Sequence, residues 1–335
     1  MRRFLSVVFL LLLLGAGGTT LKAWFDYKNP GPLAQETDVV IPHGDYLSTI
    51  HTLQQAGVLH SGFWTERLSL AAVLLTRKDG QLHAAELHFP AFVSMQEALR
   101  ILRHGRPVLH RLTIPEGLTA HQIQALLQSA PFLTDDAPLP PEGSIMPETY
   151  SYLRNTSRQK MLGRMQTAMT KAVQTLWEKR TPVPEIPDEQ AFVTLASLVE
   201  KETALPAERS LVARVFINRL QQGMKLQTDP TVIYALTNGA SPLGRPLTHS
   251  DLQITSPYNT YANAGLPPGP ICSPGLSSLE AVAHPASGTM LYFVANGQGG
   301  HNFAASLAEH NKNVQIFRQK NRRITSSRPG NRGTR

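Results

Sequence analysis

Two glutamates stand two residues apart in the apolar stretch TLASLVEKETALP, residues 194–206. Glu200 and Glu202 come shortly before Pro206, and a proline at that place ends a helix. A carboxyl group with a raised pKa can act as a general acid at neutral pH, and two carboxyls can divide the acid and base roles. The stretch is therefore a candidate site for acid–base catalysis.

A helix over residues 189–204 gives the two carboxylates different surroundings. At about 100° per residue, Glu200 and Glu202 lie about 200° apart, on opposite margins of the apolar face. Glu202 stacks on bulky side chains such as Leu195 and Val199, and it lies in the last turn, where the helix dipole disfavours a negative charge. Both effects raise the pKa of Glu202, which makes it the better general acid. The alternative is that both glutamates are solvated or ion-paired surface residues.

The segments after the glutamates carry polar side chains that suit a sugar chain. A second helix runs from Pro206 to Gly223, and MKLQTDPTVIYAL then gathers polar residues ahead of a third. The proline-stiffened loop TSPYNTYANAGLPPGP offers aromatic faces for pyranose rings and amides for their hydroxyl groups. The candidate substrate-binding residues are Asn218, Gln227, Thr228, Asp229, Tyr258, Asn259, Tyr261 and His301. For Asp229 the alternative is a helix cap, and a lone histidine is more often structural.

The last part of the chain predicts a helix, a strand, a glycine turn and a helix, and its other candidate histidines are His284 and His310. Cys272 is the only cysteine, so no internal disulfide and no cysteine-based metal site can form. Because no sequence feature marks it as a nucleophile, Cys272 is interpreted as a small packed residue. We predict no metal and no organic cofactor.

The chain begins with an apolar segment that can span a bilayer. Phe4 to Leu21 gives 18 residues without a charge, preceded by Arg2 and Arg3. Basic residues before a span favour a cytoplasmic N-terminus, so we expect a single-pass anchor over residues 1–22 and an exported body. A cleaved signal peptide is the alternative, because it shares the basic start and the apolar middle.

The formal net charge of +8 is concentrated at the two ends of the chain. Residues 318–335 hold seven basic residues and no acids, and Arg2, Arg3 and Lys22 add three, which leaves −2 for residues 23–317. The body is therefore not a nucleic-acid groove. We expect the basic tail over 318–335 to be disordered, with attraction to anionic lipid or envelope polymer as an alternative role.

At 335 residues the chain suggests two folded units. Residues 40–110 alternate short strands with helices, and the pattern breaks after Gly105. Residues 111–317 combine strands with longer helices, among them one over 157–179 whose methionine stripe is core. The predicted fold class is α+β: an N-terminal membrane helix, a small α/β module and a larger mixed α/β catalytic domain.

A series of motifs gives the chain a strong resemblance to a known family. In order they are IPEGLT, PETYSY, ASLVEKET, VFINRL, LQTDPTVIYAL, SPYNTYANAGLPPGPICSPG, AVAHPA, LYFVANGQGGHNF and LAEHN. With these motifs the chain resembles the endolytic murein transglycosylases (MltG, YceG-like) over roughly residues 40–317. The resemblance implies a LysM-like module at 40–110 and a YceG-like catalytic domain at 111–317. It makes Glu202, the second glutamate of the E-K-E motif, the catalytic residue, with Glu200 in support.

The resemblance implies a lyase in the bacterial inner membrane, with its catalytic domain in the periplasm. Such an enzyme cuts nascent peptidoglycan strands between N-acetylmuramic acid and N-acetylglucosamine, leaves 1,6-anhydro ends and terminates strand elongation. Its implied partners are glycan strands, the membrane and peptidoglycan synthases. Two alternatives stay open: a lysozyme-type muramidase that pairs Glu202 with Asp229 or Glu200, and an inactive peptidoglycan-binding scaffold.

Overall fold

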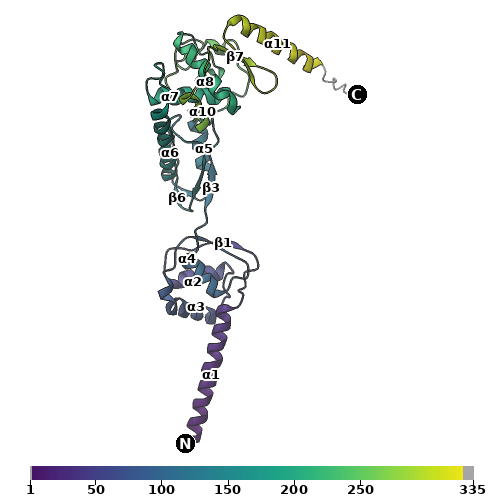
Figure 1. Ribbon diagram of the computed structural model, residues 1–335. Coiled ribbons are helices and arrows are strands. Elements are labelled where there is room, and N and C mark those ends of the chain that lie inside the picture. The colour runs from purple at the N-terminus through teal and green to yellow at the C-terminus, as the bar shows by residue number, and fades with distance from the viewer. Residues whose placement is uncertain (1, 327–335) are drawn as a thin grey trace, which may run out of the picture. The chain divides into compact units, whose positions relative to one another are not determined.

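The computed structural model describes residues 2–326, which divide into two units (Figure 1). Unit 1 is formed by the chain up to His110 together with Ser151–Asn155, and unit 2 by Arg111–Tyr150 and the chain from Thr156 onward. Helices and short two-stranded sheets occur in both units, which confirms the predicted α+β class.

The first element of unit 1 is the long helix α1 (Arg2–Lys28). Among the described residues it is the single helix that is long and apolar enough to cross a membrane, over Phe4–Lys28. The helix continues past residue 22, which was the predicted end of the anchor. A signal sequence near the N-terminus meets the same criteria of length and composition, so the membrane anchor stays a prediction.

The rest of unit 1 packs three helices around a two-stranded sheet. Strand β1 pairs antiparallel with β2, so that Val39 lies opposite Leu87, and Leu53, Phe89 and Leu102 are buried beside them. The elements are β1 (Thr37–Val40), α2 (Tyr46–Gln55), α3 (Phe63–Leu75), the 3-10 turn η1 (Arg77–Asp79), β2 (Glu86–Phe89) and α4 (Met95–His104). The LysM-like character of residues 40–110 stays a prediction.

The next part of the chain leads from the boundary between the units to a long helix. Its elements are β3 (His110–Thr113), α5 (Ala120–Ser129), β4 (Leu133–Thr134), β5 (Thr149–Tyr152), β6 (Thr156–Ser157) and α6 (Arg158–Lys179). Ser157 caps α6 by accepting from the Lys160 N–H at 3.3 Å, as its place before the helix predicts. Met161, Met165 and Met169 are buried, which confirms the methionine stripe as core.

Arg158, the first residue of α6, fixes the segment between α5 and β4. Its guanidinium donates to five backbone carbonyls, at distances from 2.7 to 3.1 Å. The acceptors are Leu127, Gln128, Ala130, Leu133 and Asp135. A planar group with five N–H donors suits this task because the carbonyls at a helix end have no partner within the helix.

The core of unit 2 is formed where α7, α8 and α10 pack together. Phe192, Val212 and Leu279, one from each helix, are fully buried, and burying such a side chain contributes about 1.5–3 kcal/mol. The elements of this part are α7 (Glu189–Glu202), α8 (Pro206–Gln221), α9 (Asp229–Thr237), η2 (Asp251–Gln253), α10 (Leu276–Ala283), β7 (Tyr292–Ala295), β8 (His301–Ala304) and α11 (Leu307–Ser326).

Two sequence predictions near the C-terminus are wrong. Residues 301–304 form strand β8, which pairs antiparallel with β7, where only a turn before a helix was expected. Helix α11 continues to Ser326, so residues 318–326 are helical and not part of a disordered tail. No glycine or proline interrupts the chain between Leu307 and Pro329, and the long basic side chains there are good helix formers. Residues 327–335 lie outside the described part.

Two glycines of unit 2 provide a matched test of this packing. Gly143 has φ +73°, and a Cβ there would lie 2.6 Å from Cβ of Pro270, whereas a Cβ on Gly163 in α6 meets nothing within 4 Å. We expect Gly143→Ala to lower the free energy of unfolding by about 1–3 kcal/mol, and Gly163→Ala to raise it by about 0.5–1 kcal/mol. Thermal unfolding followed by circular dichroism checks both, and equal midpoints for the two variants would contradict the assigned conformations.

Candidate active site

Helix α7 places Glu202 at its C-terminal end. Asp188 begins the helix by accepting from the Ala191 N–H at 2.7 Å, and Thr203 leaves it in an extended conformation. The helix ends two residues earlier than predicted, and Pro206 then starts α8. Because the apolar face of α7 is buried in the core, the last turn of the helix is a rigid platform for the carboxyl group of Glu202.

The pKa of Glu202 is raised, as the sequence predicts. The side chain is partly exposed, but protein surrounds its carboxyl group, and this burial is the main cause. The Thr228 hydroxyl donates a hydrogen bond to Oε1 of Glu202 and lowers the pKa, while the nearby charge of Asp229 raises it. Positive charge on His301 and Arg219 lowers it, without reversing the net direction.

Thr228 is itself held in place by buried hydroxyl groups. Its N–H donates to Oγ1 of Thr260 at 3.1 Å, and Oγ1 of Thr231 lies 2.8 Å from the same oxygen. Gln227 precedes it with φ +51° and donates its N–H to the Thr260 carbonyl at 3.2 Å. The hydroxyl that meets Glu202 therefore belongs to a fixed segment between α8 and α9.

Glu208 of α8 holds His301 of strand β8. Its carboxylate accepts from the His301 backbone N–H and from the ring Nδ1, both at 2.7 Å. Burial acts to raise the pKa of Glu208, but these hydrogen bonds outweigh it and the pKa is lowered. A carboxylate can only accept, so Nδ1 carries the hydrogen and Nε2 is the ring nitrogen left for other partners.

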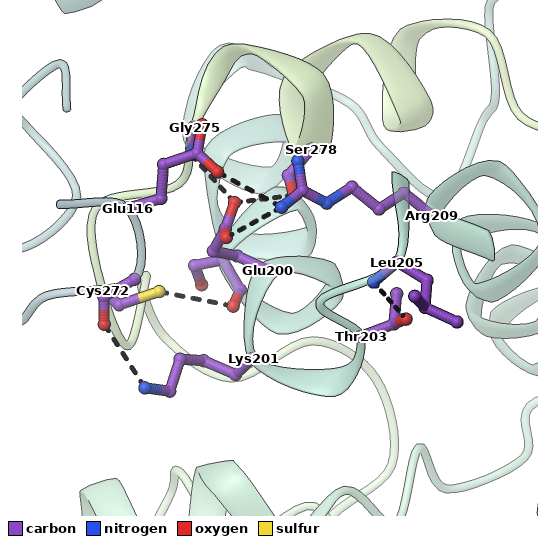
Figure 2. A network of polar contacts seen from close by, with 11 residues as sticks. Glu116, Glu200, Lys201, Thr203, Leu205, Arg209, Cys272, Gly275 and Ser278 are labelled. Atoms are coloured by element: carbon purple, nitrogen blue, oxygen red, sulfur yellow. Dashed lines mark hydrogen bonds and ion pairs between the residues drawn. The ribbon is translucent and has the colours of Figure 1, made fainter. Parts of the chain in front are cut away.

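Glu200 lies in a separate polar network, which Figure 2 shows. Oε2 accepts from the Gly275 N–H at 3.0 Å and from the Ser278 hydroxyl at 2.7 Å, and Oε1 lies 3.3 Å from Nη2 of Arg209. Arg209 also pairs with Glu116 at 3.2 Å. The Glu200 side chain is only 6% exposed, so this carboxylate joins α7, α8 and α10 from within.

Comparison with known proteins identifies the family. The model of the YceG-like family matches residues 39–316. The chain belongs to the YceG-like family. A crystal structure of a putative YceG-like protein from Listeria monocytogenes is 28% identical and covers 83% of this chain and 98% of its own, with a TM-score of 0.52.

Curated relatives of this YceG-like chain carry the name endolytic murein transglycosylase. One from Bacillus subtilis (strain 168) is 49% identical over 121 residues, which is 36% of this chain and 32% of the relative. One from Streptococcus pneumoniae serotype 2 (strain D39) is 30% identical over 330 residues, which is 82% of this chain and 57% of the relative. The chain thus spans less than two thirds of the length of either.

Several predicted binding residues lie around Glu202 in this YceG-like fold. Thr228 contacts Glu202 directly, and Asp229 and His301 are close enough to shift its pKa. Asp229 is the first residue of α9, so it is not the helix cap of the alternative interpretation, and it accepts from the Tyr261 hydroxyl at 2.6 Å. Gln227 is exposed beside Thr228. These four side chains, with Tyr261, are the predicted binding residues that lie in this part of the fold.

Three other candidates make structural contacts instead: the two asparagines bind backbone carbonyls, and Tyr258 packs against another ring. Nδ2 of Asn218 donates to the carbonyls of Gly288 and Met290, at 3.1 and 2.9 Å. Asn259 is fully buried, and its amide serves the backbone of its own loop. Tyr258 packs against Tyr234, with ring centroids 4.9 Å apart. A tight loop needs such side chains for its own carbonyls, so asparagine content alone does not mark a binding residue.

Sequence reasoning missed Arg219, which lies close to Glu202. Its guanidinium is buried and donates to the carbonyls of Leu291 at 2.7 Å and Leu226 at 2.6 Å. Burial lowers the pKa of Arg219. The available signal was its spacing from Val212 and Val215, which puts a cation on the core face of α8. Among the described residues, no three histidine, cysteine or acidic side chains gather as metal ligands do.

The two glutamates should respond oppositely to the same substitution. We expect Glu200→Gln to lower the free energy of unfolding by about 1–3 kcal/mol, because the buried Arg209 loses one carboxylate partner. Glu202→Gln should raise it at neutral pH, because the amide removes a carboxylate whose charge is disfavoured by burial.

Thermal unfolding across pH checks both variants. Because the folded pKa of Glu202 is raised above 4.5, its protonated form stabilises the fold below pH 4.5, and this stability is lost as the pH rises through the folded pKa. The advantage of Glu202→Gln over the parent should therefore be absent below pH 4.5 and grow above it. A constant difference between the two proteins would contradict the raised pKa.

Proposed function

We propose that the chain is a peptidoglycan lytic transglycosylase of the endolytic type, with Glu202 as its catalytic residue. The observation that carries the proposal is a single carboxyl group with a raised pKa at the end of α7, among polar and cationic side chains. The names of the curated relatives and the family membership support the same reaction class.

In this reaction Glu202 acts first as an acid and then as a base. The protonated carboxyl gives its proton to the oxygen between C1 of N-acetylmuramic acid and the next N-acetylglucosamine, and the C1–O bond breaks. The 6-hydroxyl of the same muramoyl residue then attacks C1, and Glu202 takes up its proton. The product carries a 1,6-anhydro ring, and no water is consumed.

The surroundings of Glu202 suit both halves of this cycle. Burial keeps the carboxyl protonated to higher pH, which favours the first step. Once the proton has left, the Thr228 hydroxyl and the positive charge of Arg219 stabilise the carboxylate until it accepts the second proton. Because the nucleophile belongs to the substrate, the mechanism needs no second carboxylate, and it uses no metal or organic cofactor.

A muramidase is the second candidate, because the charge of Asp229 acts on Glu202. In that mechanism Asp229 would serve as nucleophile or as base for water, and the product would be heavier by one water. The Tyr261 hydroxyl donates a hydrogen bond to Oδ1 of Asp229. This bond favours a role for Asp229 in raising the pKa of Glu202 over a role as nucleophile or base.

The proposed setting is the periplasmic side of the inner membrane, with α1 as a single-pass anchor and a cytoplasmic N-terminus. The arginines before the apolar run support this orientation. The substrate is then a nascent glycan strand, and cutting it ends its elongation. Unit 1 would bind glycan as a LysM-like module, and peptidoglycan synthases are the proposed partners.

Glu202→Gln should abolish strand cleavage while the fold stays intact, because an amide can neither give nor take the proton. Losing general acid–base catalysis costs about 10²–10⁴-fold, and more is expected when one group serves both steps. Mass spectrometry of products from purified glycan strands provides the measurement. Glu189→Gln, the same change at an exposed position in the first turn of α7, is the control and should keep full activity. Anhydro products from Glu202→Gln would refute the assignment.

The alkaline limb of the pH–rate profile should move in opposite directions in two further variants. Asp229→Asn removes a charge that raises the pKa of Glu202, so the limb should move to lower pH with anhydro products retained. Thr228→Val removes a hydrogen bond that lowers this pKa, so the limb should move to higher pH. The profile of kcat/KM reports these values for the free enzyme. Complete inactivity of Asp229→Asn would favour the two-carboxylate muramidase.

A further inference from the structure

Helix α3 of unit 1 exposes large apolar side chains along its outer face. Phe63, Trp64, Leu74 and Leu75 are 72%, 40%, 53% and 81% exposed. At about 100° per residue these positions, with the exposed Ala71, fall within one sector of about 120°. Arg67 is the exposed charged residue of α3 within this sector. Large apolar side chains gathered on one face in this way indicate a surface that another phase or molecule covers.

The face is held by the fold and does not result from a loose helix end. The inner side of α3 is buried through Ser69, Ala72 and Val73. At the C-terminal end, the buried guanidinium of Arg103 donates to Oγ1 of Thr76 at 2.9 Å and to the carbonyl of Gly80 at 3.1 Å. The backbone that carries Leu74 and Leu75 is therefore held by the buried face of α3 and by Arg103 at the end of the helix.

The N-terminal end of α3 is attached to α1 at the edge of its apolar run. Nε1 of Trp64 donates to Asp26 at 2.8 Å, and the Lys22 ammonium lies 5.6 Å from the centre of the Trp64 ring. Lys22 is the first charged residue after the run Phe4–Leu21, which is about 27 Å long at 1.5 Å per residue and matches a hydrocarbon core of about 30 Å. When this run crosses a bilayer, as the proposed function has it, Trp64 lies at the depth of the lipid headgroups.

The side chains around this attachment have the composition of a membrane interface. Trp24 and Phe25 of α1 are exposed beside Lys22 and Asp26, and aromatic residues concentrate at that depth. The exposed cations of α3 and η1 are Arg67, Arg77 and Lys78. The Arg67 guanidinium lies 4.8 Å from the centre of the Phe63 ring, so charge and apolar surface share one face. Basic and aromatic side chains beside an exposed apolar surface can contact the headgroups of an anionic bilayer.

We propose that α3 lies in the headgroup region of the same bilayer that α1 crosses. Phe63, Trp64, Leu74 and Leu75 enter the acyl boundary, and the basic side chains bind anionic phospholipid headgroups. The inference rests on the membrane anchor of the proposed function and adds a second, peripheral contact to it. Unit 1 is then fixed to the membrane at two places, not free to turn about a single helix. Figure 1 shows α3 at the end of unit 1 from which α1 leaves, and β1 at the opposite end.

Site-specific fluorescence in vesicles tests the contact on the full chain. Single cysteines at Phe63, Leu75, Gly17 and Val40 are labelled with an environment-sensitive dye, since the native Cys272 is buried and does not compete. The labelled proteins are reconstituted in vesicles with phosphatidylglycerol and a brominated phospholipid, whose bromine atoms quench the dye. Val40 on β1 is the matched control, an exposed apolar position that the proposal keeps in water.

We expect strong quenching at residues 17, 63 and 75, and several-fold weaker quenching at residue 40. Quenching at residue 63 should fall in Leu74→Ser/Leu75→Ser. Quenching at residue 75 should fall in Arg77→Gln/Lys78→Gln when phosphatidylglycerol is present, and not in zwitterionic vesicles. Quenching at 17 without quenching at 63 and 75 would overturn the proposal and leave the anchor intact.

Three other results would also overturn the docking of α3 on lipid. A dye at residue 17 that escapes quenching would refute the anchor itself, and with it this inference. A dye at residue 75 that responds to added glycan strands but not to brominated lipid would assign the face to glycan. A blue-shifted dye at residue 75 without quenching would show that protein covers the face.

Discussion

The carboxylate of Glu200 is the constraint on which the packing around the candidate active site depends. Burying an ionised carboxylate costs several kcal/mol unless donors replace its water. Three donors do so here: the Arg209 guanidinium, the Gly275 N–H at the start of α10 and the Ser278 hydroxyl. Hydrogen bonds to charged groups contribute about 1.5–3 kcal/mol each, enough to offset the burial. Because the donors come from α8 and α10, the last turn of α7 can neither rotate nor unwind without losing them.

The three donors that hold Glu200 explain how two glutamates so close in sequence come to lie in different surroundings. Two residues along a helix amount to about 200° of rotation, so fixing Glu200 on one side fixes the direction of Glu202 on the other. Glu200 has three donors, whereas Glu202 has the Thr228 hydroxyl and a neighbouring negative charge on Asp229. The same burial is therefore compensated at Glu200 and left to raise the pKa at Glu202. Reactivity follows from the distribution of donors, not from the residue type.

Local patterns predicted the helices and the choice of Glu202, because helical periodicity, caps and prolines act within a few residues. The helix over 157–179 and the buried face of α7 follow from such signals. The partners of the site do not, because they are far apart along the chain. Glu208 meets His301 across 93 residues, and Glu200 meets Gly275 across 75. Hydrophobic periodicity carries no information about which distant polar groups will face each other, and so Arg219 and Glu208 were missed.

Asn259, one of the two asparagines predicted to bind substrate, acts on the candidate site through its own loop. Nδ2 of Asn259 donates to the carbonyls of Leu252 and Ile254, and its Oδ1 accepts from the Tyr261 N–H. These bonds fix the loop that presents Thr260, next in sequence.

The same loop is connected to the carboxyl group of Glu202 through a second threonine. Oγ1 of Thr260 accepts from the backbone of Thr228, and the Thr228 hydroxyl donates to Glu202. The loop that Asn259 fixes is thus connected to Glu202 through the hydrogen bonds of Thr260 and Thr228. The buried amide of Asn259 holds the loop in place. Because its hydrogen bonds are made to backbone groups of that loop, they are not left for a substrate.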